Sequence, residues 1–172
     1  MTIALGILAV IAIIVIGILL YAATRPDTFR IARSATIHAP ASTLCAILTD
    51  LRRGVEWSPF EKGLTMSNSK EVGTGKFSIM DVTPAKITCN LVMLKPMKAD
   101  NIVEYALAPQ GNATVVTWSM YGPTTLMTRV MSLFMDMDKM CGDQFEKGLK
   151  DLKVLAESEA QSLPDNSRIA AA

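Results

Sequence analysis

Residues 113–160 are ATVVTWSMYGPTTLMTRVMSLFMDMDKMCGDQFEKGLKDLKVLAESEA, and the apolar pattern changes inside this stretch. Val116, Trp118 and Met120 alternate with the residues between them, as in a strand with one buried face. After Gly122-Pro123 the apolar residues recur about every 3.6 positions, which predicts helical structure to about Ala160. The stretch therefore predicts a strand followed by a long terminal helix.

Asp136 is a suitable N-cap for the longer part of this helical region, and Thr124–Phe134 is predicted to be a shorter helix before it. A single apolar face is expected to run through both parts. Its members are Val130, Phe134, Met137, Cys141, Phe145, Leu149, Leu152 and Leu155.

Upstream, the same alternation predicts further strands with one apolar side. One starts near Phe29 and is followed by a helix from about Ser42 to Leu51. Three more precede the strand at Val116, and Pro109–Asn112 is a hairpin turn between the last two. Their inward residues are expected to be Phe29, Ile31, Ala35, Ile37, Phe77, Ile79, Ile87, Cys89, Leu91, Met93, Val103, Tyr105 and Leu107. The fold class is therefore α+β, with the terminal helix covering one antiparallel sheet.

Ile3–Ala23 is a run of 21 uncharged residues that predicts a transmembrane helix. At about 1.5 Å per residue it spans about 31 Å, close to the hydrocarbon thickness of a bilayer. It has no polar stripe, unlike a core helix, and it lacks the basic start and short apolar stretch of a signal peptide. We expect a membrane anchor.

The charges beside this helix predict its orientation. Arg25, Arg30 and Arg33 follow it and no Lys or Arg precedes it. The positive-inside rule then places the rest of the chain on the cytoplasmic side of the cell membrane, as a single-pass protein. We expect a linker at 24–28, one globular domain at 29–160 and a disordered tail at 161–172.

Composition excludes several functions. The net charge of +1 gives no basic field for nucleic acid. Cys45, Cys89 and Cys141 are far apart and odd in number, which suits free thiols in a reducing compartment. No metal ligands are suitably spaced, and Asp136-x-Asp138 is a poor calcium loop because Met140 occupies the next ligand position. Neither a metal nor a cofactor is expected.

Catalytic groups are equally sparse. His38 is the only histidine, and it is expected at the surface at the end of a strand. Gly73-Thr74-Gly75 lacks the third glycine of a dinucleotide site and is expected to be a turn. Tyr105 is the only inward residue able to act as an acid or base. The question of catalysis stays open, and a non-catalytic protein is favoured.

Several short motifs resemble the START-like (SRPBCC, polyketide cyclase/dehydrase) superfamily, closest to its membrane-anchored bacterial members. They are Glu56-Trp57-Ser58-Pro59-Phe60-Glu61-Lys62, Leu94-Lys95-Pro96, Thr117–Pro123, Leu133–Met140 and Asp143-x-Phe145-Glu146-x-Gly148-Leu149. The resemblance implies a helix-grip fold, in which an antiparallel sheet wraps around the long C-terminal helix. One departure is that only nine residues, Gly63–Glu71, separate Lys62 from Val72. The short spacing therefore predicts that one strand of the grip is deleted, which would leave an open groove and an uncovered sheet edge.

Methionine is the remaining signal, since six of the eleven lie between Met120 and Met140. Methionine adapts to irregular apolar ligands, although ordinary core filling explains the same pattern. Family members often place the short helix beside the cavity mouth, which favours ligand binding. The candidate ligand-binding residues are Trp57, Phe77, Met93, Tyr105, Trp118, Met120, Met131, Met135 and Phe145.

Three functions follow from these expectations. The first is a membrane-tethered module that binds an apolar small molecule or lipid between sheet and helix. The second is an interaction domain that docks a protein partner, or weakly a second copy, on the open sheet edge. The third is an enzyme of the cyclase or dehydratase kind.

Overall fold

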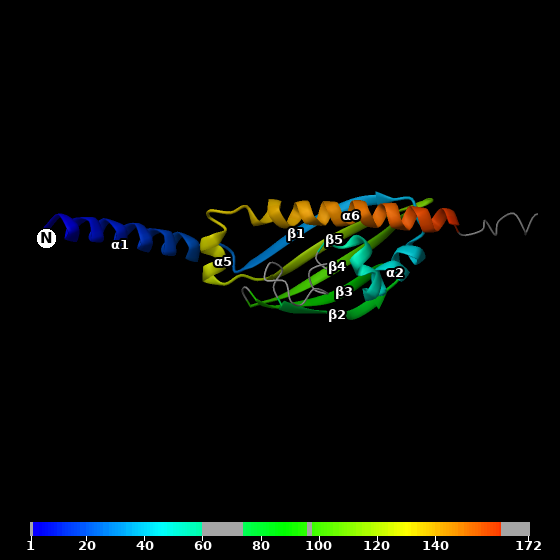
Figure 1. Ribbon diagram of the computed structural model, residues 1–172, viewed down its shortest axis with the longest axis horizontal. Coiled ribbons are helices and arrows are strands. Elements are labelled where there is room, and N and C mark those ends of the chain that lie inside the picture. Colours follow the sequence, from blue (N-terminus) through cyan, green and yellow to red (C-terminus); the bar gives the residue numbers. More distant parts are fainter. Residues whose placement is uncertain (1, 60–73, 96–97, 163–172) are drawn as a thin grey trace, which may run out of the picture.

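The computed structural model describes residues 2–59, 74–95 and 98–162. An apolar helix, α1 (Thr2–Ala23), projects from one end of an α+β domain (Figure 1). The shortened segment 63–71 lies outside the described residues, so the predicted loss of a strand there stays untested.

The domain is built on one antiparallel sheet in the order β1-β5-β4-β3-β2. Its strands are β1 (Thr28–Ile37), β2 (Thr74–Thr83), β3 (Lys86–Lys95), β4 (Ala99–Gln110) and β5 (Ala113–Pro123). β2 to β5 form a meander. Gly111, with φ of 62°, makes the turn between β4 and β5 because glycine has no Cβ to clash in this left-handed conformation.

The long helix α6 (Met137–Ser162) covers the inner face of the sheet and contacts β1 most extensively (Figure 1). The short helices α2 (Ala41–Thr49), η1 (Leu51–Arg53) and α3 (Gly54–Trp57) lie on the same side. Buried residues of the sheet, α2, α3 and α6 form one hydrophobic core. The predicted α+β, helix-over-sheet architecture is confirmed.

The predicted phase of the terminal helix is confirmed within α6. Phe145, Leu149 and Leu152 are each at most 1% exposed. Asp136 caps α6, with its side chain accepting the backbone N–H of Lys139 at 2.9 Å.

The prediction for Phe134 is wrong, because this side chain is 73% exposed. The short helix α5 spans Leu126–Met131 and ends before Phe134. Thr125 caps α5, accepting the Thr128 N–H at 3.2 Å, while Asp136 starts α6 separately. The two helices have separate axes, so no common apolar face continues from one to the other (Figure 1).

Candidate functional site

Four aromatic side chains meet between the sheet and α6. Trp57 comes from α3, Tyr105 from β4, Trp118 from β5 and Phe145 from α6, and each is at most 4% exposed. Register places Tyr105 opposite Trp118 on neighbouring strands, with ring centroids 5.2 Å apart. Trp57 meets both rings edge-on, at 5.9 Å from Tyr105 and 5.4 Å from Trp118. We call these four residues the aromatic cluster.

The cluster is joined to α6 by a stacked pair and a glycine. The rings of Trp118 and Phe145 are parallel within 5°, with centroids 4.5 Å apart. A Cβ at Gly148 would lie 2.6 Å from Cζ3 of Trp118 and 3.0 Å from Cδ of Pro59. Gly148 therefore lets the Trp118 ring approach the helix backbone, and it fixes how closely α6 lies on the sheet.

The other candidate residues surround the cluster less closely. Phe77 and Met120 are partly buried and pack against the core. Met93 on β3 and Met131 on α5 are partly buried, whereas Met135, between α5 and α6, is 44% exposed. The structure thus brings four of the nine candidates into one contact group and places Met135 at the surface.

The interior offers little acid–base chemistry. The buried polar side chains among the described residues are Ser58, Asn101, Thr114 and Ser119, and none of these is an acid or a base near neutral pH. Burial, with a smaller effect of Asp138, raises the pKa of the partly buried Cys141 thiol, which keeps it protonated and unreactive. Within the described part of the chain, no cluster of three or more His, Cys, Asp or Glu residues could hold a metal ion.

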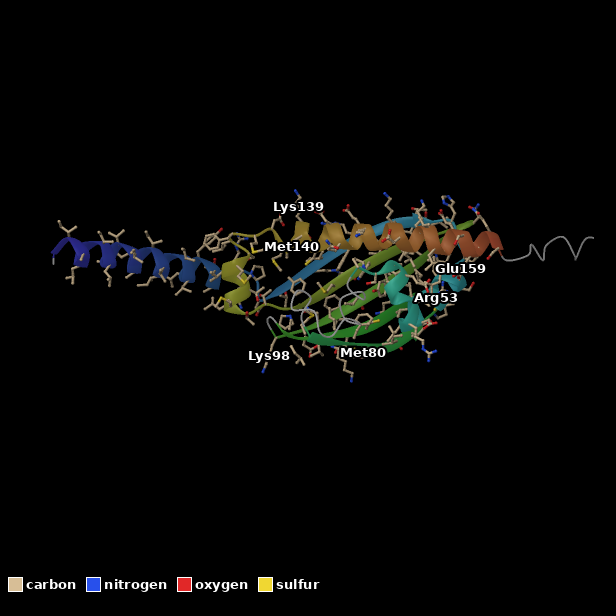
Figure 2. The ribbon with its side chains drawn as sticks, viewed as in Figure 1. Arg53, Met80, Lys98, Lys139, Met140 and Glu159 are labelled. Carbon is tan, nitrogen blue, oxygen red and sulfur yellow. The ribbon has the colours of Figure 1, made fainter. Side chains whose placement is uncertain are left out.

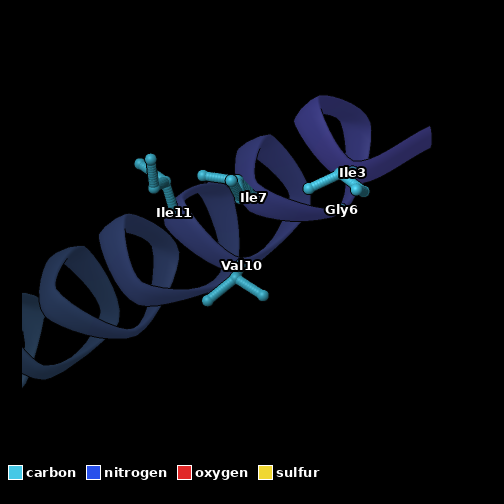
Figure 3. Close-up of a pocket in the computed structure, with 5 residues that line it drawn as sticks. All are labelled: Ile3, Gly6, Ile7, Val10 and Ile11. Atoms are coloured by element: carbon cyan, nitrogen blue, oxygen red, sulfur yellow. The ribbon is translucent and has the colours of Figure 1, made fainter. Parts of the chain in front are cut away.

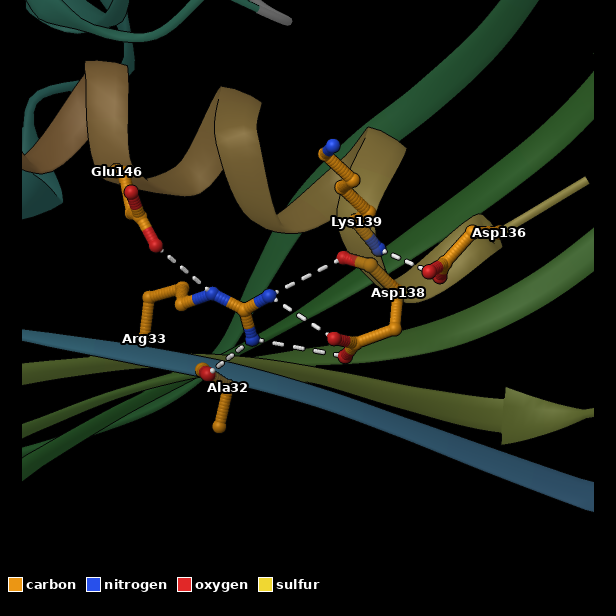
Figure 4. A network of polar contacts seen from close by, with 6 residues as sticks. All are labelled: Ala32, Arg33, Asp136, Asp138, Lys139 and Glu146. Atoms are coloured by element: carbon orange, nitrogen blue, oxygen red, sulfur yellow. Dashed lines mark hydrogen bonds and ion pairs between the residues drawn. The ribbon is translucent and has the colours of Figure 1, made fainter.

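Arg33 fixes the start of α6 to the edge of the sheet (Figure 4). Its Nη2 lies 2.9 Å from Oδ2 of Asp138 and its Nε lies 3.1 Å from Oε1 of Glu146. Hydrogen bonding to Asp138 is the main reason that the pKa of Arg33 is raised. The guanidinium lies against Gly142, where a Cβ would collide with it.

Sequence reasoning missed this contact because it used Arg33 only as a charge beside the anchor. Arg33 pairs with Trp118 in register, so it points to the inner face like Ile31 and Ala35. Alternate residues of a strand face the same side of the sheet, so the position of Arg33 between Ile31 and Ala35 was the available signal.

The far end of α6 is held by two further polar contacts. Arg53 on η1 forms ion pairs with Glu159 and Glu56, and hydrogen bonding to Glu159 is the largest cause of its raised pKa. Figure 2 shows Arg53 and Glu159 close together at this end. The predicted surface His38 is confirmed: its ring is 62% exposed and contacts Glu157 at 3.1 Å. Together with Arg33, these contacts hold both ends of the helix above the cluster.

Two surface hollows lie away from the cluster. One is a notch on α1, where Gly6 leaves space between Ile3, Ile7, Val10 and Ile11 (Figure 3). The other lies on the outer face of the sheet, between the starts of β1 and β4 and the end of β5. Arg30 and Tyr121 line this second hollow and make a cation–π contact, with Cζ of Arg30 5.8 Å from the ring centroid.

Solved structures share this fold. A protein from Chromobacterium violaceum has 17% sequence identity and a TM-score of 0.53, and the match covers 77% of this chain and 99% of that one. An AHSA1-like protein from Rhizobium etli has 16% identity and a TM-score of 0.51, over 77% and 84% of the two chains. The di-domain ARO/CYC protein StfQ from the steffimycin biosynthetic pathway has 10% identity and a TM-score of 0.56.

The match to StfQ covers 78% of this chain and only about half, 52%, of StfQ. Comparisons with protein-family models and with curated proteins return no match. At these identities the likeness is one of fold. The domain therefore has the START-like (SRPBCC) fold that the resemblance in short sequence motifs implies.

Proposed function

We propose that this protein is a membrane-tethered START-like module that binds an apolar small molecule or lipid between its sheet and α6, without catalysing a reaction. The observation that carries the proposal is the aromatic cluster, in which rings from four separate elements pack against one another between the sheet and α6. Apolar and aromatic walls with few polar groups are typical of sites for apolar ligands.

Trp57 is the member of the cluster that we expect to move when a ligand enters. It sits on the four-residue helix α3, whereas Tyr105 and Trp118 sit on β4 and β5, which pair with each other in the interior of the sheet. Its buried indole N–H has no hydrogen-bond partner among the residues that the structure describes. Such a group costs free energy, which a polar atom of a ligand would recover.

Tethering is supported by α1. Its apolar window of 18 residues has none of its length buried in the domain, which excludes a core helix. A signal sequence would pass the same test of length and composition. The length of the run favours a retained single-pass anchor, and the arginines after it favour a domain on the cytoplasmic side.

The buried polar side chains of the described residues include no acid or base, which supports the non-catalytic part of the proposal. Among these residues, Tyr105 is the one inward hydroxyl with acid–base capacity, and a cyclase or dehydratase needs positioned proton donors or acceptors.

A second candidate function is docking of a protein partner on the sheet edge. β2 is the edge of the described sheet, and its Met80 and Val82 are 62% and 46% exposed. An edge strand with apolar side chains is able to recruit another strand.

Native mass spectrometry of the full chain, released from detergent micelles after incubation with a fatty acid, tests the ligand proposal. We expect bound fatty acid or a co-purifying apolar compound, with lower occupancy in Trp57→Ala. Val154→Ala is the matched control, because Val154 is 67% exposed on α6. A chain that stays free of any apolar compound would favour the protein-docking function.

A further inference from the structure

The surface between β5 and α6 carries an unusual concentration of exposed apolar side chains. Leu126, Met127, Phe134 and Met135 are 46%, 63%, 73% and 44% exposed. They lie within residues 124–135, which we call the α5 segment. Met140, in the first turn of α6, is 48% exposed and adds another apolar side chain at the same end of the domain (Figure 2). Such a concentration indicates an interaction surface.

The α5 segment is hydrogen-bonded to the residues that follow α1. The backbone N–H of Thr124 donates to the carbonyl of Asp27 at 2.7 Å, and the Thr124 hydroxyl donates to the carbonyl of Pro26 at 3.0 Å. Nη1 of Arg129 donates to the carbonyl of Arg25 at 3.3 Å. α5 also contacts α1 directly and lies across its end in Figure 1. The exposed apolar side chains are therefore held where α1 leaves the domain.

The charge of the segment suits a lipid surface. From Thr124 to Met135 the sequence contains one charged residue, Arg129, and no acidic residue. Arg25 and Arg30 add positive charge just after α1, where Asp27 is the one acidic residue between them. Exposed Leu, Met and Phe side chains with nearby arginines are the combination found where amphipathic segments lie in the interface of anionic membranes.

We propose that the α5 segment is a second membrane contact, with Leu126, Met127, Phe134 and Met135 inserted among the headgroups and upper acyl chains of a phospholipid bilayer. This inference rests on the tethering part of the proposed function. It adds that the domain has a fixed orientation relative to the bilayer. The domain is held end-on at the bilayer surface, with the start of α6 nearest the membrane, and it does not swing on its linker.

Brominated lipids test this pose, because bromine on the acyl chains quenches tryptophan only at close range. The full chain is reconstituted in vesicles of phosphatidylcholine and phosphatidylglycerol, with and without bromine. Phe134→Trp is compared with Val154→Trp, an equally exposed position on the part of α6 beyond the cluster. The signal of the wild-type protein, from the buried Trp57 and Trp118, is subtracted.

We expect the added emission of Phe134→Trp to fall at least about twofold in brominated vesicles, since interfacial segments bury their apolar face about 5–10 Å deep. Val154→Trp should keep its emission. Equal quenching of the two variants, or none in either, would overturn the proposal. Ile11→Trp, in the middle of α1, separates the causes: if it is quenched while Phe134→Trp is not, the anchor stands and only the second contact fails. Ligand binding between sheet and α6 is measured separately by mass spectrometry.

Discussion

The aromatic cluster and the α5 segment are both apolar, yet one is buried and the other is largely exposed. Each residue of the cluster is at most 4% exposed, and each ring contacts another. The α5 segment leaves Phe134 and Met127 more than half exposed. The cluster draws its members from four elements, whereas the segment is a single short helix and turn. Several apolar side chains this exposed within one short segment indicate a surface that contacts something outside the domain.

The difference also separates two uses of large apolar residues. Trp118 and Phe145 hold the helix on the sheet through a stacked contact. Met127 and Met135 are largely exposed, so filling of the core does not explain these two methionines.

The largest effect is expected for Phe145→Ala. This change removes a ring that is 1% exposed and stacked on Trp118, so the free energy of unfolding should fall by about 3–5 kcal/mol. Denaturant unfolding of the full chain in detergent, followed by tryptophan fluorescence, measures it. Val154→Ala should change the free energy by less than about 0.5 kcal/mol. Similar values for the two variants would show that α6 does not pack as described.

Two glycines of α6 give a matched pair. In Gly148→Ala the new Cβ meets the buried Trp118 ring at 2.6 Å, and overpacking should cost about 1–3 kcal/mol despite the better helix propensity of alanine. In Gly142→Ala the new Cβ meets only the flexible end of Arg33, which is able to move away. We expect Gly142→Ala to be clearly less harmful in the same unfolding assay. The reverse order would mean that Arg33, and not the cluster, sets the position of the helix.

A smaller effect concerns acid stability. The pKa of Glu157 is lowered from its ordinary value of 4.5, chiefly because the backbone N–H of His38 donates to it. A carboxyl group with a depressed folded pKa stabilises the fold above its unfolded pKa, and this contribution is lost as the pH falls through the folded pKa. Glu157→Gln should therefore reduce the loss of stability as the pH falls below the ordinary pKa of 4.5. An unchanged acid limb in pH-dependent unfolding would contradict this.

The smallest effect on stability is expected in the α5 segment. Phe134→Ser removes a large ring that is 73% exposed, so the free energy of unfolding in detergent should change by less than about 0.5 kcal/mol. The contrast with Phe145→Ala compares the same residue type in the two regions. A loss of unfolding free energy near that of Phe145→Ala would show that Phe134 is buried in solution. The contrast between a buried cluster and an exposed α5 segment would then be wrong.

The sequence predicted the sheet, the terminal helix and the buried members of the cluster, because alternation on the strands and the spacing of Phe145, Leu149 and Leu152 report burial directly. The prediction for Phe134 was wrong because its spacing fits one continuous helix, whereas the caps at Thr125 and Asp136 start two helices with different axes. Arg33 was missed because an inward-pointing charge has no apolar signal. The role of Gly148 depends on its contact with Trp118, 30 residues away in the sequence, which no local pattern contains.

The central claim is that an apolar ligand binds at the aromatic cluster, between the sheet and α6. A fatty acid with a photoreactive diazirine on its chain tests it most directly, with the full chain in detergent and the adducts mapped by peptide mass spectrometry. We predict adducts on the peptides that carry Trp118 and Phe145, and their loss when excess ordinary fatty acid is added. Adducts confined to α1 and the α5 segment and insensitive to competitor would contradict the claim.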